Sequence, residues 1–551
     1  MCAAYFYDGA GRLERIENSN GTKTYFYEYD AAHRLLKLRH ESAAAQVLSR
    51  IEYTWNLDNT VATRTEYDAT VSPATTDVTT FTYDQRHRLI SENRVRNGST
   101  AVYAIEYDYD ALGNRKEKRL TLSDGLHVTD YTYDVDSDDP ENELTYPTRN
   151  NRLLSYREYG PDEELQRTVY YTYYDRGACS NITIKDESSP SVRKDLGLFY
   201  NGNGTLWIAL WSQWQVNEQG VPQSFEMTAA KEFRFDRPRQ RYLMRDLDPN
   251  NGWAIVGSGV WTDYIGDAPH LDYTVSSGAA VTHSTAYLTG AGTAVARESF
   301  TSAVQHDPAS VEFLHGDLVG STILRTDSSG SVAQPPSAVS YTAFGEPVAG
   351  GSVGGALPSG FSRYGYAGYY GYESDSIVMQ GVDTTLPALT LAHLGARWYQ
   401  AGIGRFVQRD PVGLADGLNA YAYVANDPSY SVDFDGLKRY RVLTKVEHTE
   451  VRIPLYSEGQ YIGTLVLSQT KKYYDIFDTH SELRFAGFVV SLIGFTGAFL
   501  SPLAGPAAPL ALGLSRCISV VGIIMGGTGL AAPDVKVGTE VEVTYNTPRI
   551  E

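Results

Sequence analysis

The sequence predicts a protein that is all-β for most of its length, built as a shell of β-hairpins. Its 551 residues include 41 Tyr, 18 Phe and 7 Trp beside 50 Gly, a composition that favours short strands and tight turns over helices. A Tyr-Asp unit also recurs after stretches in which polar and apolar residues alternate. Such alternation is typical of strands that bury one face.

The Tyr-Asp unit is most regular in residues 1–195, which we predict to be the first part of the shell. Each Asp is followed by Gly, Ala, Asn or another residue suited to a turn before the next strand. Repeats spaced by about 20 to 30 residues are expected for stacked hairpins. We therefore interpret the tyrosines as packing residues and the aspartates as turn formers. The copies begin at Tyr7-Asp8, Tyr29-Asp30, Tyr83-Asp84 and Tyr109-Asp110, with weaker ones at Tyr133-Asp134 and Tyr174-Asp175.

Residues 196–310 form a divergent, β-rich continuation in which the repeat is hard to follow. Residues 207–211 and 254–257 are apolar enough to be buried strands. The segment is also rich in tryptophan, and we expect these side chains to pack in a core rather than to stack on carbohydrate. They are Trp207, Trp211, Trp214, Trp253 and Trp261.

Charge and cysteine content exclude several classes of protein. The net charge of -19 argues against a general nucleic-acid surface, which needs a basic face. Cys2, Cys179 and Cys517 have neither the spacing of a zinc site nor the even number of a disulfide framework. The first residues lack a basic segment followed by an apolar run, so no classical signal peptide is predicted.

Residues 397–437 carry the best candidate for chemistry. Two units of the form DxxGL, Asp410 to Leu414 and Asp433 to Leu437, bracket a spacer rich in Tyr and Asn. Two carboxylates that share a proton can activate water for peptide hydrolysis, and the peptide within reach is the chain's own. Taken alone, such units are better explained as turns in which Asp caps backbone amides and Gly adopts a positive φ.

This stretch resembles the RHS repeat-associated core, the self-cleaving segment of bacterial RHS/YD-repeat proteins and of the C subunits of insecticidal toxin complexes. The resemblance implies an aspartic autoprotease without metal or cofactor. It assigns Asp410 and Asp433 to the dyad, Arg397 to the essential basic residue, and the scissile bond to Leu437-Lys438. The residues that carry the resemblance are Gly404-Arg405-Phe406, Asp410 to Leu414, Asn419, Tyr421, Tyr423, Asn426, Pro428 and Asp433 to Leu437.

One position departs from the pattern of that family. Phe434 stands where the second unit of the family has proline, so a fixed φ angle is lost at the turn before the cut. Upstream, residues 313–321 resemble another signature of the family, which extends the predicted RHS core to 311–437. His315 and Asp317 lie there, and with no third ligand in sequence they are interpreted as structural rather than metal-binding.

Residues 438–551 are predicted to be a variable C-terminal effector, either a small α+β domain or a membrane-active one. A hairpin is expected around residues 457–460. The run 485–515 carries no charge and a second apolar run continues to 533. Membrane insertion by 485–533 and a buried glycine-rich core are both compatible with this pattern. An enzymatic site at Asp475, Asp478, His480 and Glu482 is a third alternative, although a solvated helix start explains that cluster better.

The resemblance implies an RHS-family toxin carrier, secreted or at the cell surface by a non-classical route. Its β-shell would enclose the C-terminal tail as cargo until cleavage after Leu437. Further partners would be another shell subunit, secretion machinery or an immunity protein. Because the family commonly uses more repeats than 437 residues can hold, the shell here is expected to be an open, partial one. The alternative is a non-catalytic cell-surface or adhesion scaffold of YD repeats.

Overall fold

The structure is a computed structural model. It describes residues 2–134, 151–217, 219–237, 240–265, 268–276, 281–290, 293–300, 310–333, 339–349, 352–354, 357–358, 361–411, 413, 418–433, 436, 440–441, 445–457, 460–478, 520–524, 535–545 and 549–550. The chain divides into two compact units. One comprises Met1–Tyr5 and Arg15–Arg439, and the other comprises Phe6–Glu14 and Tyr440–Glu551.

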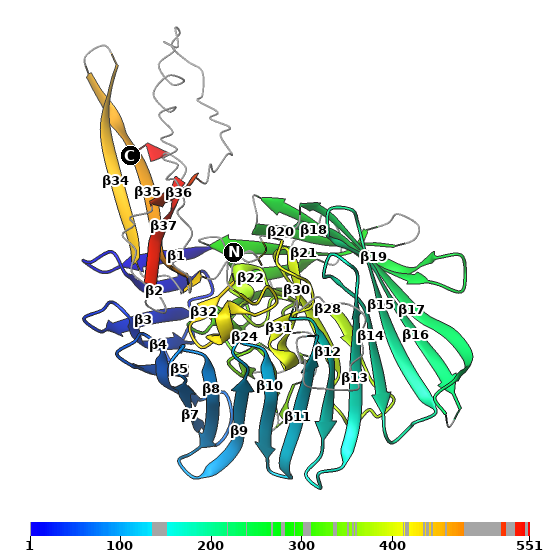
Figure 1. Ribbon diagram of the computed structural model, residues 1–551. Coiled ribbons are helices and arrows are strands. Elements are labelled where there is room, and N and C mark those ends of the chain that lie inside the picture. The colour runs from blue at the N-terminus through cyan, green and yellow to red at the C-terminus, as the bar shows by residue number, and fades with distance from the viewer. Residues whose placement is uncertain are drawn as a thin grey trace. The chain divides into compact units, whose positions relative to one another are not determined.

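A single sheet of 24 strands makes up most of the first unit. From β2 to β24 each strand pairs antiparallel with the next one in sequence. Figure 1 shows these strands, blue to green, curving around the yellow segments that follow them. The predicted all-β shell is confirmed.

The strands of this sheet have the following bounds: β1 Ala3–Tyr7, β2 Leu13–Asn18, β3 Lys23–Tyr29, β4 Leu35–Glu41, β5 Val47–Trp55, β6 Val61–Asp68, β7 Thr75–Tyr83, β8 Leu89–Arg96, β9 Thr100–Tyr109, β10 Arg115–Leu122, β11 Gly125–Tyr133, β12 Leu153–Tyr159, β13 Leu165–Tyr173, β14 Cys179–Asp186, β15 Val192–Tyr200, β16 Leu206–Val216, β17 Pro222–Arg237, β18 Gln240–Asp248, β19 Ala254–Ile265, β20 Ala268–Ser276, β21 Val281–Gly290, β22 Thr293–Phe300, β23 Val311–Gly316 and β24 Thr322–Thr326.

Burial alternates along the strands, so one face of the sheet is shielded from solvent. In β9, Tyr103, Ile105 and Tyr107 are buried, whereas Glu106 and Asp108 between them are exposed. This is the expected result of a period-2 pattern, since successive side chains of a strand point to opposite faces. Of the repeat tyrosines, Tyr109 and Tyr133 are buried, whereas Tyr7, Tyr29 and Tyr83 are half-buried, so the predicted inward packing is complete only for the first two.

The aspartate of each regular repeat closes the turn between two strands. Asp84 Oδ1 accepts hydrogen bonds from the backbone N–H of Arg86 (2.8 Å) and Arg88 (3.0 Å), and Oδ2 accepts one from Arg88 Nε (2.6 Å). Arg88 Nη1 then donates to the carbonyl of Asp110 in the next repeat, at 2.7 Å. Asp30 uses Arg34 in the same way. The side chains of the motif thus make each turn and connect it to the following one.

One of the two weaker repeats departs from the predicted register. The other, Tyr133-Asp134, keeps it, since Asp134 Oδ1 accepts the N–H of Arg152 at 2.9 Å. At the turn after β13, Tyr174 N–H donates to Ala178 O (2.9 Å) and Tyr174 O accepts from Gly177 N–H (2.8 Å). Tyr174 therefore occupies the position that Asp holds elsewhere, and the unit there is Tyr173-Tyr174 rather than the predicted Tyr174-Asp175. Sequence alone misplaced it because both readings begin with tyrosine.

The last hairpin of the sheet packs against the first strands, so the sheet spirals. His40 on β4 contacts the carbonyl of Gly316 through Nε2 at 3.1 Å, and Asn20 Nδ2 donates to Asp327 O at 2.8 Å. The rings of His40 and His315 meet edge to face with centroids 5.1 Å apart. Among the described residues, β24 forms a ladder with β23 and with none of the first strands, so strand pairing does not close the sheet into a barrel. One backbone hydrogen bond, from Ala43 N–H to Gly330 O at 3.4 Å, joins turns of the two regions.

The segment after the sheet fills the concave side with short elements. Apolar side chains of the shell, such as Val169, Ile182 and Phe233, form one cluster with Leu391 and Trp398 of this segment. Its elements are β25 Ser340–Tyr341, β26 Pro347–Ala349, β27 Ser352–Val353, η2 Gly368–Tyr370, β28 Glu373–Met379, β29 Leu389–Leu394, β30 Arg397–Gln400, η3 Ala401–Ile403, β31 Arg405–Phe406, η4 Val424–Asn426 and β32 Ser431–Val432, followed by β33 Tyr440–Arg441.

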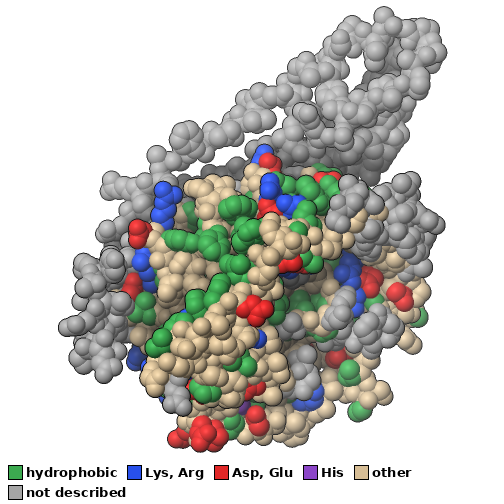
Figure 2. All heavy atoms as spheres, turned by 90° about the vertical axis from the view of Figure 1, so that its right-hand side faces the viewer, with side chains coloured by type: hydrophobic (Ala, Val, Ile, Leu, Met, Phe, Trp, Pro, Cys, Tyr) green, Lys and Arg blue, Asp and Glu red, His purple; other side chains and the backbone are tan. Residues whose placement is uncertain are grey.

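The tryptophan-rich part of the shell forms the predicted core only in part. Trp211 packs against the buried cluster that contains Leu206 and Ala209. Residues 207–211 and 254–257 lie in strands β16 and β19, yet Trp207 is 44% exposed and Trp253 43%. Ile255 and Val256 are also exposed. Hydrophobic side chains are visible on the face of the sheet shown in Figure 2. A strand has two faces, and the local sequence does not indicate which tryptophan lies on the face that is covered by the core.

The described residues of the second unit's C-terminal part are all in strands. They are β34 Lys445–Ser457, β35 Gln460–Asp478, β36 Val520–Ile524, β37 Val535–Tyr545 and β38 Arg549–Ile550. β34 and β35 form the expected antiparallel hairpin. Asp475 and Asp478 belong to β35. The prediction that this polar cluster begins a helix is therefore wrong for these two residues. Apart from β36, residues 485–533 lie outside the described residues. No helix among the residues that the structure describes has the length and apolarity to span a membrane.

Candidate functional site

Arg397 begins the central strand of a small sheet inside the shell. β30 lies between β29 and β31, with Leu394 opposite Arg397 and Tyr399 opposite Phe406. The guanidinium carbon of Arg397 lies 3.6 Å from the centre of the Phe406 ring. A planar guanidinium stacks well on an aromatic face. Arg397 is only 2% exposed, so its charge needs partners inside the protein.

Both predicted aspartates come after a short strand in the chain and are buried. Asp410 follows β31, and its N–H donates to Ala420 O at 2.9 Å while its carbonyl accepts from Gly413 N–H at 2.9 Å. Asp433 directly follows β32. Their exposures are 5% and 2%. Asp433 thus directly follows its strand, whereas residues 407–409 separate Asp410 from the end of β31.

The two carboxylates converge on one nitrogen. Arg397 Nη2 is 2.8 Å from Asp433 Oδ2 and 3.0 Å from Asp410 Oδ2. Because both oxygens contact the same atom, the carboxylates are neighbours. A guanidinium between them offsets their mutual repulsion and lets two acids share a dry site. The structure therefore brings together the three side chains that the sequence assigned to the site.

The backbone after Asp433 is held at the same guanidinium. Arg397 Nε donates to the carbonyl of Gly436, and Nη1 donates to Ala420 O at 3.3 Å. Gly436 has φ of 70°, and a Cβ there would lie 2.4 Å from Leu394 O. Only glycine fits this close approach. Leu437 and Lys438, the predicted scissile pair, lie outside the described residues, as does Phe434, so the site is seen up to the residue before that bond.

The spacer between the aspartates is tied to turns of the shell. Asn419 Nδ2 donates to Asn114 Oδ1 (2.8 Å), Asn426 Nδ2 to Gly113 O (2.9 Å), and Tyr421 OH to Gly177 O (2.8 Å). These three residues belong to the motif that carries the family resemblance. Their geometry explains the residue types: each reaches a polar group of a repeat turn and so fixes where the two aspartates meet.

Tyr372 contacts the site, and nothing in the sequence signalled it. Its hydroxyl donates to the backbone carbonyl of Asp433 at 2.5 Å and lies 3.3 Å from Tyr423 OH. Burial raises the pKa of the Tyr372 phenol well above its usual range, and the negative charge of Asp433 raises that pKa further. The phenol therefore stays protonated and remains a donor.

His315 and Asp317 have structural partners. His315 Nε2 contacts Thr326 Oγ1 at 2.8 Å, and Asp317 accepts the N–H of Ser321 at 2.7 Å in a turn. Burial lowers the pKa of His315 to about 4 and raises that of Asp317 to about 6. Among the described residues no group of three or more His, Cys, Asp or Glu side chains is arranged to hold a metal ion.

Comparison with known proteins relates the chain to toxin subunits. A family model described as RHS Repeat matches residues 7–45. The toxin subunit YenC1 of Yersinia entomophaga is 22% identical over 470 residues, and YenC2 of the same organism is 24% identical over 465. Each alignment covers 78% of this chain and 42% of the relative. The chain thus spans less than half the length of these toxin subunits.

Two solved structures are similar at low identity. The crystal structure of TcdB2-TccC3-Cdc42 matches with 18% identity and a TM-score of 0.39, and that of TcdB2-TccC3 without the hypervariable C-terminal region matches with 19% identity and a TM-score of 0.39. Both matches cover 79% of this chain and 21% of the other.

Proposed function

We propose that this chain, an RHS-repeat protein related to the toxin subunits YenC1 and YenC2, is a toxin carrier whose core cuts the chain after Leu437 and frees residues 438–551 as an effector. One observation carries the proposal. Two buried aspartates at equivalent ends of two DxxGL units meet at the single guanidinium of Arg397. Burying two carboxylates against one guanidinium leaves a net negative charge inside the protein, which is unfavourable for stability and so favours a function for the pair. Two neighbouring carboxylates are suited to accept and donate a proton.

The arrangement supports hydrolysis in cis. One carboxylate takes a proton from water as the water oxygen attacks the carbonyl carbon of Leu437. The protonated group then gives that proton to the nitrogen of Lys438 as the C–N bond breaks, leaving a new carboxylate on Leu437 and a new amine on Lys438. General acid and base roles are thus filled by aspartates alone.

Arg397 has two tasks in this scheme. Its charge stabilises the aspartates and the negative charge that develops next to them. Its Nε–H holds the carbonyl of Gly436, one residue before the bond to be cut. The substrate is therefore held at two points before the bond, through Asp433 and through Gly436, which raises its effective concentration. The reaction is a single turnover.

The shell has a part in the proposed function as well. The chain spans 42% of the length of its toxin relatives, and its sheet has open edges among the described residues. We therefore propose that a further subunit or further chain completes the enclosure around the effector, and that the assembled protein acts outside the producing cell. The alternative function is a non-catalytic scaffold. In it, Arg397 only stabilises two turns by pairing with their aspartates.

Intact-mass spectrometry under denaturing conditions separates these alternatives. The parent is expected to give two fragments that divide between Leu437 and Lys438, whereas Asp433→Asn and Asp410→Asn give one uncut chain. Asp427→Asn is the matched control, because Asp427 is a buried carboxylate of the spacer, 1% exposed, outside the proposed dyad. It should still cut. A single uncut parent chain would refute the autoprotease and favour the scaffold.

A further inference from the structure

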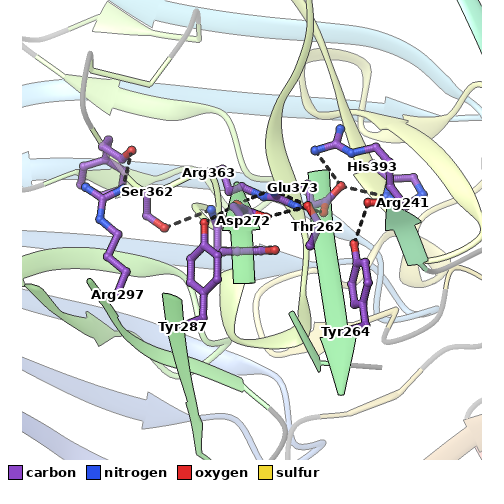
Figure 3. Close-up of polar contacts among 12 residues, drawn as sticks. Arg241, Thr262, Tyr264, Asp272, Tyr287, Arg297, Ser362, Arg363, Glu373 and His393 are labelled. Carbon is purple, nitrogen blue, oxygen red and sulfur yellow. Dashed lines mark hydrogen bonds and ion pairs between the residues drawn. The ribbon is translucent and has the colours of Figure 1, made fainter. Parts of the chain in front are cut away.

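A buried ion network joins the core to the shell. Glu373 forms ion pairs with Arg363 and with Arg241, the latter at 3.1 Å, and accepts a hydrogen bond from His393 Nδ1 at 3.2 Å. Arg363 Nη1 in turn lies 2.6 Å from Asp272 Oδ2. Figure 3 shows Glu373 and Arg363 at the centre of this set.

The network spans four successive strands of the shell. Arg241 comes from β18, Thr262 from β19, Asp272 from β20 and Tyr287 from β21. Asp272 accepts hydrogen bonds from Thr262 Oγ1 (2.6 Å) and Tyr287 OH (2.7 Å). The core contributes only Arg363, Glu373 and His393. The set therefore forms only where the shell strands and the core meet.

Charges within the network are matched. Burial alone would raise the pKa of Glu373, but the charges of Arg241 and Arg363 outweigh it and hold that pKa well below its usual range. Glu373 is thus ionised whenever the shell supplies Arg241. Without the shell strands, Glu373 would lose Arg241 and keep Arg363 and His393 of the core as partners, and burial of a less well paired charge is unfavourable.

Tyr372 connects this network to the proposed cleavage site. It directly precedes Glu373, and neighbouring residues of an extended backbone point to opposite sides. Glu373 faces the shell strands, while the Tyr372 hydroxyl donates to the backbone carbonyl of Asp433 at 2.5 Å. The two residues are 2% and 1% exposed, so neither contact is weakened by water.

We propose that Tyr372 is a positioning residue for Asp433, and that the Glu373 network holds Tyr372 in place from the shell side. Self-cleavage then requires that β18 to β21 have packed onto the core. The inference rests on the proposed autoprotease and deepens it, because it makes assembly of the shell a condition for the cut. A displacement of a reacting group by about 1 Å costs roughly a hundredfold in rate, so a modest shift of Asp433 suffices.

The test follows cleavage of newly made chains. The full chain is synthesised in a cell-free system with a short radioactive pulse, and the uncut fraction is followed with time at several pH values. Tyr372→Phe removes only the hydroxyl. Tyr366→Phe is its matched control. Tyr366 OH also donates to a buried backbone carbonyl, that of Ala343 at 2.9 Å, and its ring packs beside the Tyr372 ring with centroids 6.2 Å apart, so the two variants differ in which acceptor loses its donor.

A second pair of variants tests the shell side. Asp272→Asn removes a charge of the network, and Glu346→Gln removes one from another buried shell-to-core pair, Lys118 with Glu346 at 2.7 Å. Partial unfolding lowers the final cut fraction but leaves the rate constant of the folded molecules unchanged. Mispositioning lowers the rate constant and shifts its pH profile.

We expect Tyr372→Phe and Asp272→Asn to lower the rate constant roughly tenfold or more, and Tyr366→Phe and Glu346→Gln to leave it within roughly twofold. If the parent cuts and Tyr372→Phe and Tyr366→Phe have equal rate constants, this inference is overturned and the proposed autoprotease stands. A parent that does not cut would overturn both.

Discussion

Replacing Arg397 by lysine separates the charge of this residue from its geometry. Arg397 contacts four acceptors, namely two carboxylates through Nη2 and two backbone carbonyls through Nε and Nη1. Lysine has a single nitrogen and no fork. If that nitrogen stays between the carboxylates, the carbonyls of Gly436 and Ala420 lose their donor.

The expected magnitudes follow from those lost contacts. A hydrogen bond that involves a charged group contributes about 1.5 to 3 kcal/mol, so we expect Arg397→Lys to lower the free energy of unfolding by roughly 2 to 4 kcal/mol after partial relaxation. Arg397→Met leaves two buried carboxylates without a cation, and breaking a buried pair costs about 3 to 5 kcal/mol. Loss of the Gly436 anchor should slow cleavage roughly a hundredfold in the lysine variant.

Two measurements check this. Pulse-labelled synthesis gives the cleavage rate constant. Denaturant unfolding is compared within an Asp433→Asn background, where cleavage is expected to be absent and Asp410 remains as the buried carboxylate paired with residue 397. A lysine variant that cuts as fast as the parent would refute the role given to the guanidinium fork. A methionine variant as stable as the parent would refute the electrostatic account of the buried aspartates.

Three further predictions concern the turns and the buried histidine. Asp84→Ala should lower the unfolding free energy by about 2 kcal/mol, and Asp84→Asn by less because its amide oxygen still accepts the two backbone N–H groups; denaturant titration measures both. The pKa of His315 is lowered to about 4 in the folded protein, against about 6.5 in the unfolded chain. The stability that this group contributes is therefore complete above about pH 6.5 and falls by roughly 3 kcal/mol as the pH drops toward 4. The difference in unfolding free energy between parent and His315→Gln should change over that window, and a constant difference would contradict the prediction. Gly436→Ala should block cleavage, because its Cβ would lie 2.4 Å from a carbonyl oxygen. Gly413→Ala should only slow it, because Gly413 has a φ of 74° but no atom within 4 Å of the added Cβ. Intact-mass spectra taken over time measure both effects.

The repeat shell could be predicted because its information is local. Alternation assigns a dry face to each strand, and an aspartate such as Asp84 makes its turn with residues two and four positions away. The positions of Asp410, Asp433 and Arg397 could be named for a different reason, since the fixed spacings of a known motif surround them. In both cases the relevant partners are close in sequence or recur in a pattern.

Other features depended on which strands meet in space. Trp207 and Trp253 were expected in a core and are largely exposed, because a tryptophan packs inward only if its face of the sheet has a covering layer. The register at Tyr174 differed because two overlapping tyrosines fit the repeat equally well. Tyr372 was missed because it lies 61 residues from Asp433 in sequence and shares no motif with it.

The sequence by itself determined the strands, their turns and the residue types that gather at the site, because each of these follows from periodicity or from short-range hydrogen bonds. The tertiary structure alone decided that the last hairpin returns to the first strands, that two aspartates share one guanidinium, and that Glu373 links four shell strands to the residue beside Asp433. Those relations join positions tens to hundreds of residues apart, and burial in one low-dielectric interior is what gives them their strength.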